Sequence, residues 1–290
     1  MHDQIVPEIK KYDEALHQAD PRKNKLLIQL SLESFTFCIF NQDLNKFLSI
    51  ESITFEPQSR LSEIALQLKQ FYSGHPWLKQ TYHSIKLLFE SNKSTLIPAP
   101  LFDENEKESF SAFNFPVNDD ESIYFNKLKN LDAYIVYPAP DILIKTTKEI
   151  FPDHLLYCHS GVFIESLLIL NKNQKIQKRF FVNTRNNFLD IVILDGRKLL
   201  YHNSFSYKSK EDFIYFVIFV IEQLQLNPED IELVLSGMID KNSRLFDTIY
   251  KYIRNVSFQT KTDAFNYSYV FNEVPSYNYF NLLNFELCEL

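Results

Sequence analysis

The chain has 290 residues, of which 45% are hydrophobic and 23% charged, and its formal net charge is −7 at pH 7. This length predicts about two domains with substantial cores and excludes a disordered chain. The negative charge, without a dense Lys and Arg cluster, excludes nucleic acid and anionic membranes as expected partners.

No segment of the sequence resembles a membrane span or a targeting signal. The longest uninterrupted apolar run, residues 213–221, is nine residues long, whereas a bilayer crossing needs about 20. Residues 1–20 are mixed in charge and lack an apolar stretch, unlike a secretory or transit peptide. We therefore expect a cytoplasmic protein with no membrane insertion. Its three cysteines are too scattered for a disulfide framework or a zinc site, which predicts buried, reduced thiols.

The first part of the chain predicts a three-stranded meander followed by a helix and a strand. Apolar runs separated by polar breaks indicate strands over 26–30, 35–40 and 47–55. Apolar residues at helical spacing predict a helix over 60–72, and a buried strand is expected at 85–89.

The middle of the chain is less regular. The Pro-rich, acidic segment 97–121 is interpreted as a loop plus a short helix. The elements expected after it are strands at 123–128 and 133–137, a helix at 142–150, a strand at 155–158 and a helix at 162–170.

The first pattern then returns, which predicts a duplication. Its elements are strands at 179–182, 188–194 and 198–205, a helix at 210–224 and a strand at 231–235. Asp195-Gly196 predicts a tight hairpin turn, because glycine tolerates a positive φ. The predicted domains are an N-terminal extension (1–22), a first half (23–171), a linker (172–178) and a second half (179–290).

The middle of the predicted helix 210–224 is apolar on every side. Such a helix must be covered on two sides, which we expect its own sheet and the other half to do. The alternative is a central strand, because short apolar runs fit both structures.

The repeated order of strands and helices is similar to the actin-like ATPase superfamily. Within it, the chain resembles a family of uncharacterised Bacteroidetes proteins, DUF3822. The residues that carry this resemblance are Pro98-Ala99-Pro100-Leu101-Phe102, Phe151-Pro152, His159-Ser160, and Tyr279-Phe280 with Cys288-Glu289. The resemblance implies an α/β fold of two ribonuclease H-like halves, each with a mixed five-stranded sheet.

In nucleotide-using members of that superfamily, an Asp-x-Gly turn follows the first strand of each half and approaches the phosphates. By strand register, Gln29-Leu30-Ser31 and Asn183-Thr184-Arg185 take these positions, and neither keeps the acid or the glycine. Ser236-Gly237-Met238 keeps one glycine of the paired glycines in the nucleoside-binding turn. Gly237 fits either a retained adenosine contact or a simple turn, and the turn is favoured. The resemblance therefore implies degenerate nucleotide-binding turns, with Gln29, Ser31, Asn183, Arg185, Ser236 and Gly237 as cleft positions and no cofactor expected.

Other candidate sites are weak. The four glycines are too far apart to form a glycine-rich phosphate loop. His154, Cys158 and His159 have no supporting ligand pair for zinc, and Cys158-His159-Ser160 lacks the spacing of a base-activated nucleophile. No metal site and no catalytic residue are predicted.

Asp190 interrupts an apolar strand, and a buried carboxylate there needs a cation or several donors. Arg185 or Arg197 as its partner makes Asp190 structural, which we favour over a catalytic acid.

Two C-terminal segments are rich in aromatic residues. Residues 265–271 alternate so that a strand would place Phe265, Tyr267, Tyr269 and Phe271 on one face. A helix is expected around Tyr279, Phe280, Leu283 and Leu287. Both segments fit either the core or a surface that contacts another protein.

The sequence thus favours a non-catalytic binding or scaffolding protein of the actin-like fold, with a protein as its partner. The alternative from another class is a divergent ATP-binding protein, an ATPase or kinase, with unfamiliar cleft residues. An oligomerising structural protein is a third hypothesis, because polymerisation recurs in the superfamily.

Overall fold

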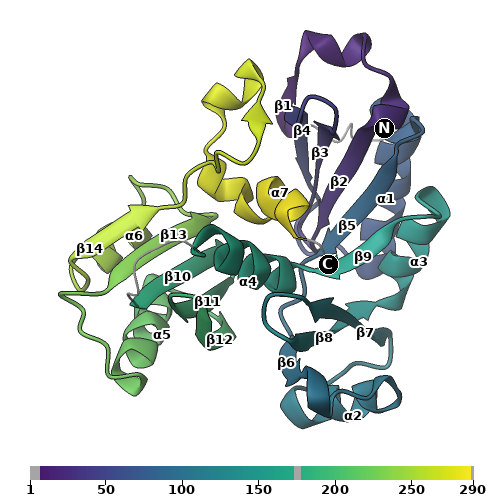
Figure 1. The fold of residues 1–290 in the computed structure, drawn as a ribbon. Helices are drawn as coiled ribbons and strands as arrows, with labels where there is room; N and C mark the ends of the chain where they lie inside the picture. The colour runs from purple at the N-terminus through teal and green to yellow at the C-terminus, as the bar shows by residue number, and fades with distance from the viewer. Residues whose placement is uncertain (1–6, 173–177, 289–290) are drawn as a thin grey trace. The chain divides into compact units, whose positions relative to one another are not determined.

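The computed structural model describes residues 7–172 and 178–288, which form a mixed α/β chain (Figure 1). The chain divides into two compact units. The first contains the described residues up to Val162, with Asp263–Val274 and Cys288, and the second contains those of Phe163–Thr262 with Pro275–Leu287. Only the end residues of the predicted linker 172–178 are described, so the predicted domain bounds stay a prediction.

The main sheet of the first unit has the strand order β1-β4-β3-β2-β5-β9, and β15 also pairs with β4. The predicted meander and its two parallel neighbours are confirmed. Strand β1 was not predicted and lies in the predicted N-terminal extension, whereas β15 is a short part of the strand predicted over 265–271. The strands are β1 (Pro7–Tyr12), β2 (Asn24–Leu30), β3 (Ser34–Asn41), β4 (Lys46–Thr54), β5 (Ser84–Phe89), β9 (Leu155–Cys158) and β15 (Asn266–Tyr267).

Two helices of the first unit, α1 (Leu61–Gly74) and α3 (Asp141–Ile150), pack side by side against this sheet (Figure 1). Helix α1 begins where the Arg60 amide donates to the Glu63 carboxylate at 2.6 Å, which satisfies one of the free amides of the first turn. Its buried positions are Ile64, Ala65 and Leu68, so it covers the sheet with one apolar stripe, as the spacing predicts.

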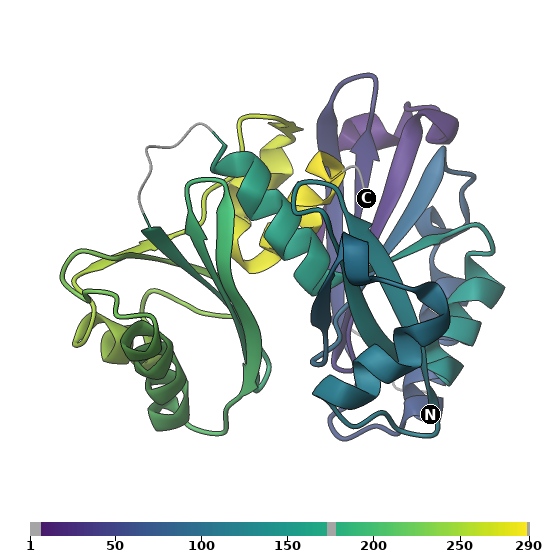
Figure 2. The same ribbon diagram turned by 60° about the horizontal axis from the view of Figure 1, so that its bottom comes forward.

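A small insert in the first unit carries its own three-stranded sheet, β6-β8-β7, with α2 (Lys107–Asn114) lying against it (Figure 2). Its strands are β6 (Thr95–Pro98), β7 (Glu121–Leu128) and β8 (Ala133–Pro140). The core of the insert comprises Ile97, Ile123 and Val136 with partly buried aromatic residues around them. The loop predicted from residue 97 is therefore wrong at its start, because Ile97 and Pro98 pair with β8.

The second unit has a five-stranded sheet in the order β12-β11-β10-β13-β14. This is the order of β4-β3-β2-β5-β9, with the same parallel and antiparallel neighbours, so the predicted repeat is confirmed. Gly196 has a φ of 57°, as its predicted hairpin turn requires. The strands are β10 (Lys178–Arg185), β11 (Phe188–Asp195), β12 (Lys198–Ser206), β13 (Glu232–Gly237) and β14 (Asn255–Phe258).

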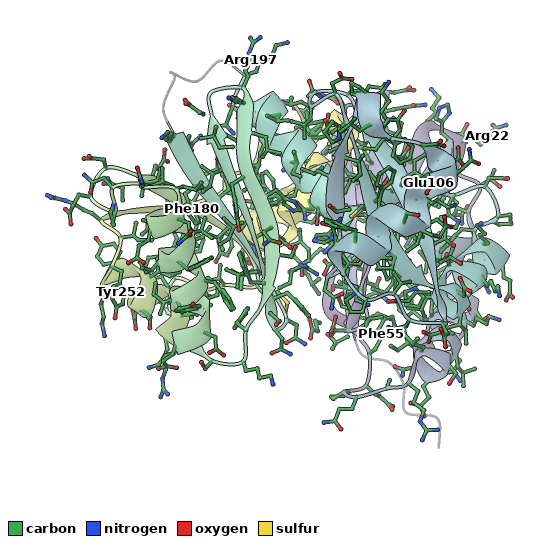
Figure 3. All side chains as sticks on the ribbon, turned by 90° about the horizontal axis from the view of Figure 1, so that it is seen from below. Arg22, Phe55, Glu106, Phe180, Arg197 and Tyr252 are labelled. Carbon is green, nitrogen blue, oxygen red and sulfur yellow. The ribbon has the colours of Figure 1, made fainter. Side chains whose placement is uncertain are left out.

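The helices of the second unit are α4 (His159–Leu170), whose first turn belongs to the first unit, α5 (Lys210–Gln223), α6 (Arg244–Tyr250) and α7 (Phe280–Asn284). Helix α5 begins with a reciprocal pair of bonds between Ser209 and Asp212. Its inner face packs into a core that includes Phe180, labelled in Figure 3.

The predicted cover of α5 by its own sheet is confirmed for one face, and cover of the other face by the other half stays a prediction. Tyr215 is 60% exposed and Phe219 38% exposed, and their rings stack on each other. Within its own unit the helix is therefore buried on one side, although the sequence is apolar all round.

Of the two aromatic segments near the C-terminus, one differs from its predicted structure and the other agrees with it. Only Asn266–Tyr267 is extended, and Tyr269–Glu273 forms a 3-10 helix, so the predicted strand over 265–271 is wrong. The rings of Phe265, Tyr267 and Phe271 contact Phe47 of β4; Phe271 is buried in the core, Phe265 and Tyr267 are partly buried, and Tyr269 is exposed. The tail is helical in α7, as predicted, with Phe280 and Leu283 buried.

Candidate functional site

The turn after β2 is closed by its own serine. Ser31 is buried, and its hydroxyl accepts hydrogen bonds from the amides of Glu33 at 3.0 Å and Ser34 at 2.9 Å. The Ser31 amide donates to the Ser34 carbonyl at 2.9 Å. Two amides of this turn therefore already bond to a side chain and are not presented to an anion.

The turn after β10 lies further along the chain than the sequence predicts. Asn183, Thr184 and Arg185 are not turn residues but the end of β10, where they pair with Asp190, Leu189 and Phe188. The turn itself is the two-residue Asn186-Asn187 hairpin, with Asn187 at a φ of 58°. In the first half the shift is smaller: Gln29 and Leu30 lie on β2, and only Ser31 is in the turn.

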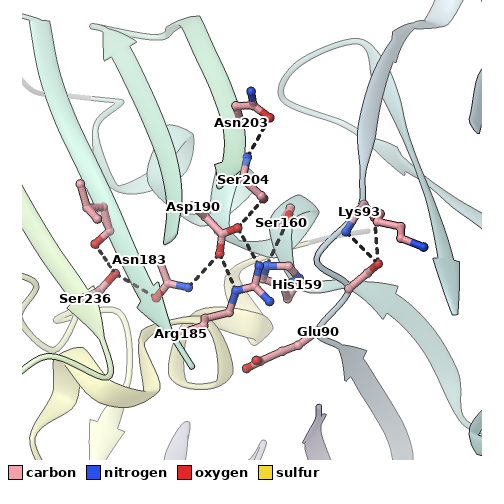
Figure 4. A network of polar contacts seen from close by, with 12 residues as sticks. Glu90, Lys93, His159, Ser160, Asn183, Arg185, Asp190, Asn203, Ser204 and Ser236 are labelled. Atoms are coloured by element: carbon pink, nitrogen blue, oxygen red, sulfur yellow. Dashed lines mark hydrogen bonds and ion pairs between the residues drawn. The ribbon is translucent and has the colours of Figure 1, made fainter. Parts of the chain in front are cut away.

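Asp190 of β11 is the centre of a buried polar network in the second unit (Figure 4). Arg185 donates two hydrogen bonds to the Asp190 carboxylate, from Nε at 2.8 Å and from Nη2 at 2.9 Å. The Ser204 hydroxyl donates at 2.5 Å and the Asn183 amide at 3.3 Å. The prediction of Arg185 as the structural partner of Asp190 is confirmed, while Arg197 donates to the Lys172 carbonyl instead.

These contacts determine what Asp190 can do chemically. A carboxylate offers about four lone-pair positions, and four donors bond to this one. A residue so occupied is a poor base or metal ligand. The network also fixes Asn183, whose side-chain oxygen accepts from the Ser236 hydroxyl at 3.2 Å. Three of the predicted cleft positions, Asn183, Arg185 and Ser236, are thus joined in one network around Asp190.

Gly237 at the end of β13 has a structural reason to be glycine. Its φ of +84° is rarely adopted by other residues, and an added Cβ would lie 2.0 Å from the Thr184 carbonyl oxygen. The same carbonyl accepts a hydrogen bond from the Met238 amide at 2.6 Å. These contacts support the interpretation of Gly237 as a turn residue that lets β13 approach β10.

The histidines and the cysteine considered as metal ligands have other contacts. His154 Nδ1 lies 2.7 Å from the Phe151 carbonyl, and burial lowers the pKa of His154. The Cys158 amide donates to the Asn126 side chain at 2.8 Å. His159 and Ser160 are buried on the first turn of α4, with Nε2 and Oγ 3.2 Å apart. Within residues 7–172 and 178–288, no three His, Cys, Asp or Glu side chains are grouped to hold a metal.

A second buried polar cluster, in the first unit, was not predicted. Glu51 of β4 accepts a hydrogen bond from Tyr12, and its Oε2 lies 3.0 Å from His75 Nε2. Lys10 Nζ lies 3.7 Å from the other oxygen. Tyr12 and Lys10 are on β1, so Glu51 fastens this edge strand to the sheet. Glu51 interrupts an apolar strand as Asp190 does, and that signal could have revealed it.

Burial alone would raise the pKa of Glu51, but its hydrogen bonds from His75 and Tyr12 outweigh burial and hold that pKa below its usual value. A lowered pKa gives stability that is complete above the pKa of the unfolded chain, about 4.3, and is lost as the pH falls through the folded value. We expect Glu51→Gln to lower the free energy of unfolding by about 1.5–3 kcal/mol at neutral pH.

Urea unfolding of both proteins from neutral to acidic pH measures this effect. The difference between wild type and variant is expected to shrink below about pH 4. A difference that stays constant or grows in acid would contradict this role of Glu51.

All three cysteines are buried and form no disulfide, and burial raises the pKa of Cys38. None of the helices formed by the described residues has the length and apolar character needed to cross a bilayer.

Comparison with known proteins agrees with the fold. A protein of unknown function from Bacteroides thetaiotaomicron, described as having an actin-like ATPase fold, is similar over 93% of this chain and 97% of its own, with 24% identity and a TM-score of 0.80. The PilM-PilN type IV pilus biogenesis complex is similar over 92% of this chain and 98% of the matched chain, with 12% identity and a TM-score of 0.60. The two halves therefore have the actin-like ATPase fold that the sequence predicts.

A search of curated proteins gave no sequence match. The family model described as "Protein of unknown function (DUF3822)" matches residues 13–256, most of the chain. The chain belongs to this family.

Proposed function

We propose that this protein is a non-catalytic binding or scaffolding protein that uses the actin-like fold without nucleotide. The observation that carries the proposal is the closure of the turn after β2, where the Ser31 hydroxyl accepts hydrogen bonds from the amides of Glu33 and Ser34. Phosphate binding by such turns depends on backbone amides that face the ligand. At the equivalent end of β10, where a phosphate-binding turn would have a small residue, this chain has Arg185. Its long side chain is hydrogen-bonded to Asp190.

A protein partner is part of the proposal. One chain of the same fold, similar over 92% of this chain, is described as part of a complex between two proteins, PilM and PilN. That likeness supports the use of the fold as a binding platform. The buried cysteines without disulfides support a cytoplasmic location.

Calorimetric titration with ATP and Mg²⁺, together with an ATPase assay, tests the proposal. We expect no binding tighter than about 1 mM and no turnover. Micromolar binding, or turnover that Asn183→Ala abolishes, would instead support a divergent ATP-binding protein. Asn183→Ala is informative because Asn183 lies at the end of β10 beside Asp190.

A further inference from the structure

The negative charge of this protein is concentrated in one short segment. Residues 101–121 contain seven acidic residues and one basic residue, a net charge of −6 (1 − 7), whereas the whole chain has a net charge of −7. The rest of the chain is therefore almost neutral. The segment forms the outer layer of the insert, leading into α2 and out of it.

Most of these carboxylates form no ion pair with another described residue. Glu121 pairs with Lys93 at 3.0 Å. Among the residues that the structure describes, no Lys, Arg or His forms an ion pair with the other six: Asp103, Glu104, Glu106, Glu108, Asp119 and Asp120. Asp103 and Glu106 instead accept hydrogen bonds from Asn105 and Ser109. The carboxylates thus project an unbalanced negative field into solvent.

The same helix presents an aromatic ring to solvent. Phe113 is 91% exposed, more than any other large hydrophobic residue of the described chain. Phe113 follows Glu106 by seven positions and Ser109 by four, so at 3.6 residues per turn all three share one side of the helix. We call the exposed residues Glu104, Glu106, Glu108 and Phe113, which lie on α2 and on the turn before it, the acidic face, although only Glu106 and Phe113 share one side of the helix; Figure 3 labels Glu106.

The core of the insert is formed in part by the inner side of α2 and does not include Phe113. Phe110 faces the core of the insert with Phe102 and Phe125, and Ser111 is fully buried. Phe113 takes no part in that core. An exposed aromatic ring on the same helix as several free carboxylates fits a protein interface, where aromatic residues anchor the centre and charges form the rim.

We propose that the acidic face docks a basic segment of a partner protein that carries at least one apolar side chain for Phe113. This inference deepens the proposed function and rests on it. The negative charge of the segment determines which kind of partner can bind. A second copy of this face, an anionic membrane and nucleic acid would all be repelled by a net charge of −6, whereas Lys and Arg side chains would be attracted.

The test uses two fluorescent peptides of equal length, one with Lys and Leu on opposite sides of a helix and one with every Lys replaced by Glu. We expect the full-length protein to bind the Lys peptide saturably at one site, more weakly as salt increases, and not to bind the Glu peptide. Phe113→Ser should weaken binding about tenfold or more. A triple variant of Glu104, Glu106 and Glu108 to Gln should slow association and reduce the salt dependence.

Tyr215→Ser is the matched control, because Tyr215 is an exposed aromatic residue on another helix, and it should leave binding unchanged. Circular dichroism and thermal unfolding establish that each variant is folded. Binding of the Lys peptide that neither the Phe113 nor the triple variant weakens, or no binding at all, would overturn the proposal. So would a dimer that Phe113→Ser dissociates, since the face would then bind a second copy.

Capture from the native host separates this inference from the proposed function. A partner retained by wild type and lost with Phe113→Ser supports the acidic face. A partner retained equally by both proteins overturns the acidic face and leaves the scaffolding function intact. Binding of ATP and Mg²⁺ would remove the proposed function whatever the peptides do.

Discussion

Replacing Arg185 with alanine is expected to lower the free energy of unfolding by about 3–5 kcal/mol. The change removes both guanidinium hydrogen bonds to Asp190, a carboxylate with 0% exposure. Ser204 and Asn183 remain as donors, but neither carries a positive charge. Chemical denaturation of both proteins at neutral pH measures the loss.

Two comparisons make this prediction specific. Arg197→Ala is the matched control, because the bond of Arg197 within the described residues is to the Lys172 carbonyl and not to a buried carboxylate, and it should change stability by less than about 0.5 kcal/mol. A double variant, Arg185→Leu with Asp190→Leu, should lose less than Arg185→Ala, since no buried charge is left without its partner. Equal losses in Arg185→Ala and Arg197→Ala would contradict the assigned role of Arg185.

Gly237→Ala is expected to cost about 2–5 kcal/mol, from backbone strain and overpacking together. The residue has a φ of +84°, and its Cβ would lie 2.0 Å from the Thr184 carbonyl oxygen and 2.8 Å from Asn183 Oδ1. The carbonyl cannot retreat easily, because it accepts the Met238 amide at 2.6 Å. Thermal unfolding should show a clearly lower midpoint.

Gly74→Ala serves as the control for this variant. Gly74 ends α1, and an added Cβ there meets nothing within 4 Å. Alanine should be neutral or stabilise the protein by about 0.4–1 kcal/mol, because it reduces the entropy of the unfolded chain. If both variants behaved alike, the close approach of β13 to β10 would not explain Gly237.

The order of strands could be predicted because apolar periodicity reports burial directly. Strands β2, β3, β10 and β11 are buried along most of their length and read as apolar runs. Strand β1 could not be recognised in this way, because it is an edge strand in which Lys10 and Lys11 interrupt the apolar pattern. Helix α6 and strand β14 were missed for a related reason: both are short, and most of their positions are partly exposed.

The turn positions were harder to predict than the strands. Polar residues usually mark the end of a strand, but Asn183, Thr184 and Arg185 continue β10 because the buried Asp190 pairs with two of them. Sequence reasoning suggested the ion pair and still placed the turn too early. The sequence of α5 is apolar all round but does not indicate what covers each face, and Tyr215 and Phe219 lie on the side that its own unit leaves exposed.

Side-chain clusters that join distant parts of the chain are hard to predict from the sequence. Tyr12, Glu51 and His75 come from a strand, another strand and the end of a helix, and only the charge of Glu51 within an apolar strand hints at them. The acidic segment around α2 was visible as composition, but the exposure of Phe113 on it required the structure.

A crystal structure grown with saturating Mg²⁺ and a non-hydrolysable ATP analogue tests most directly whether the closed turns exclude nucleotide. We predict that the Ser31 hydroxyl keeps its bonds to the amides of Glu33 and Ser34, that Arg185 stays bonded to Asp190, and that no phosphate lies at either turn. A triphosphate bonded to those amides, with Ser31 rotated away, would contradict it.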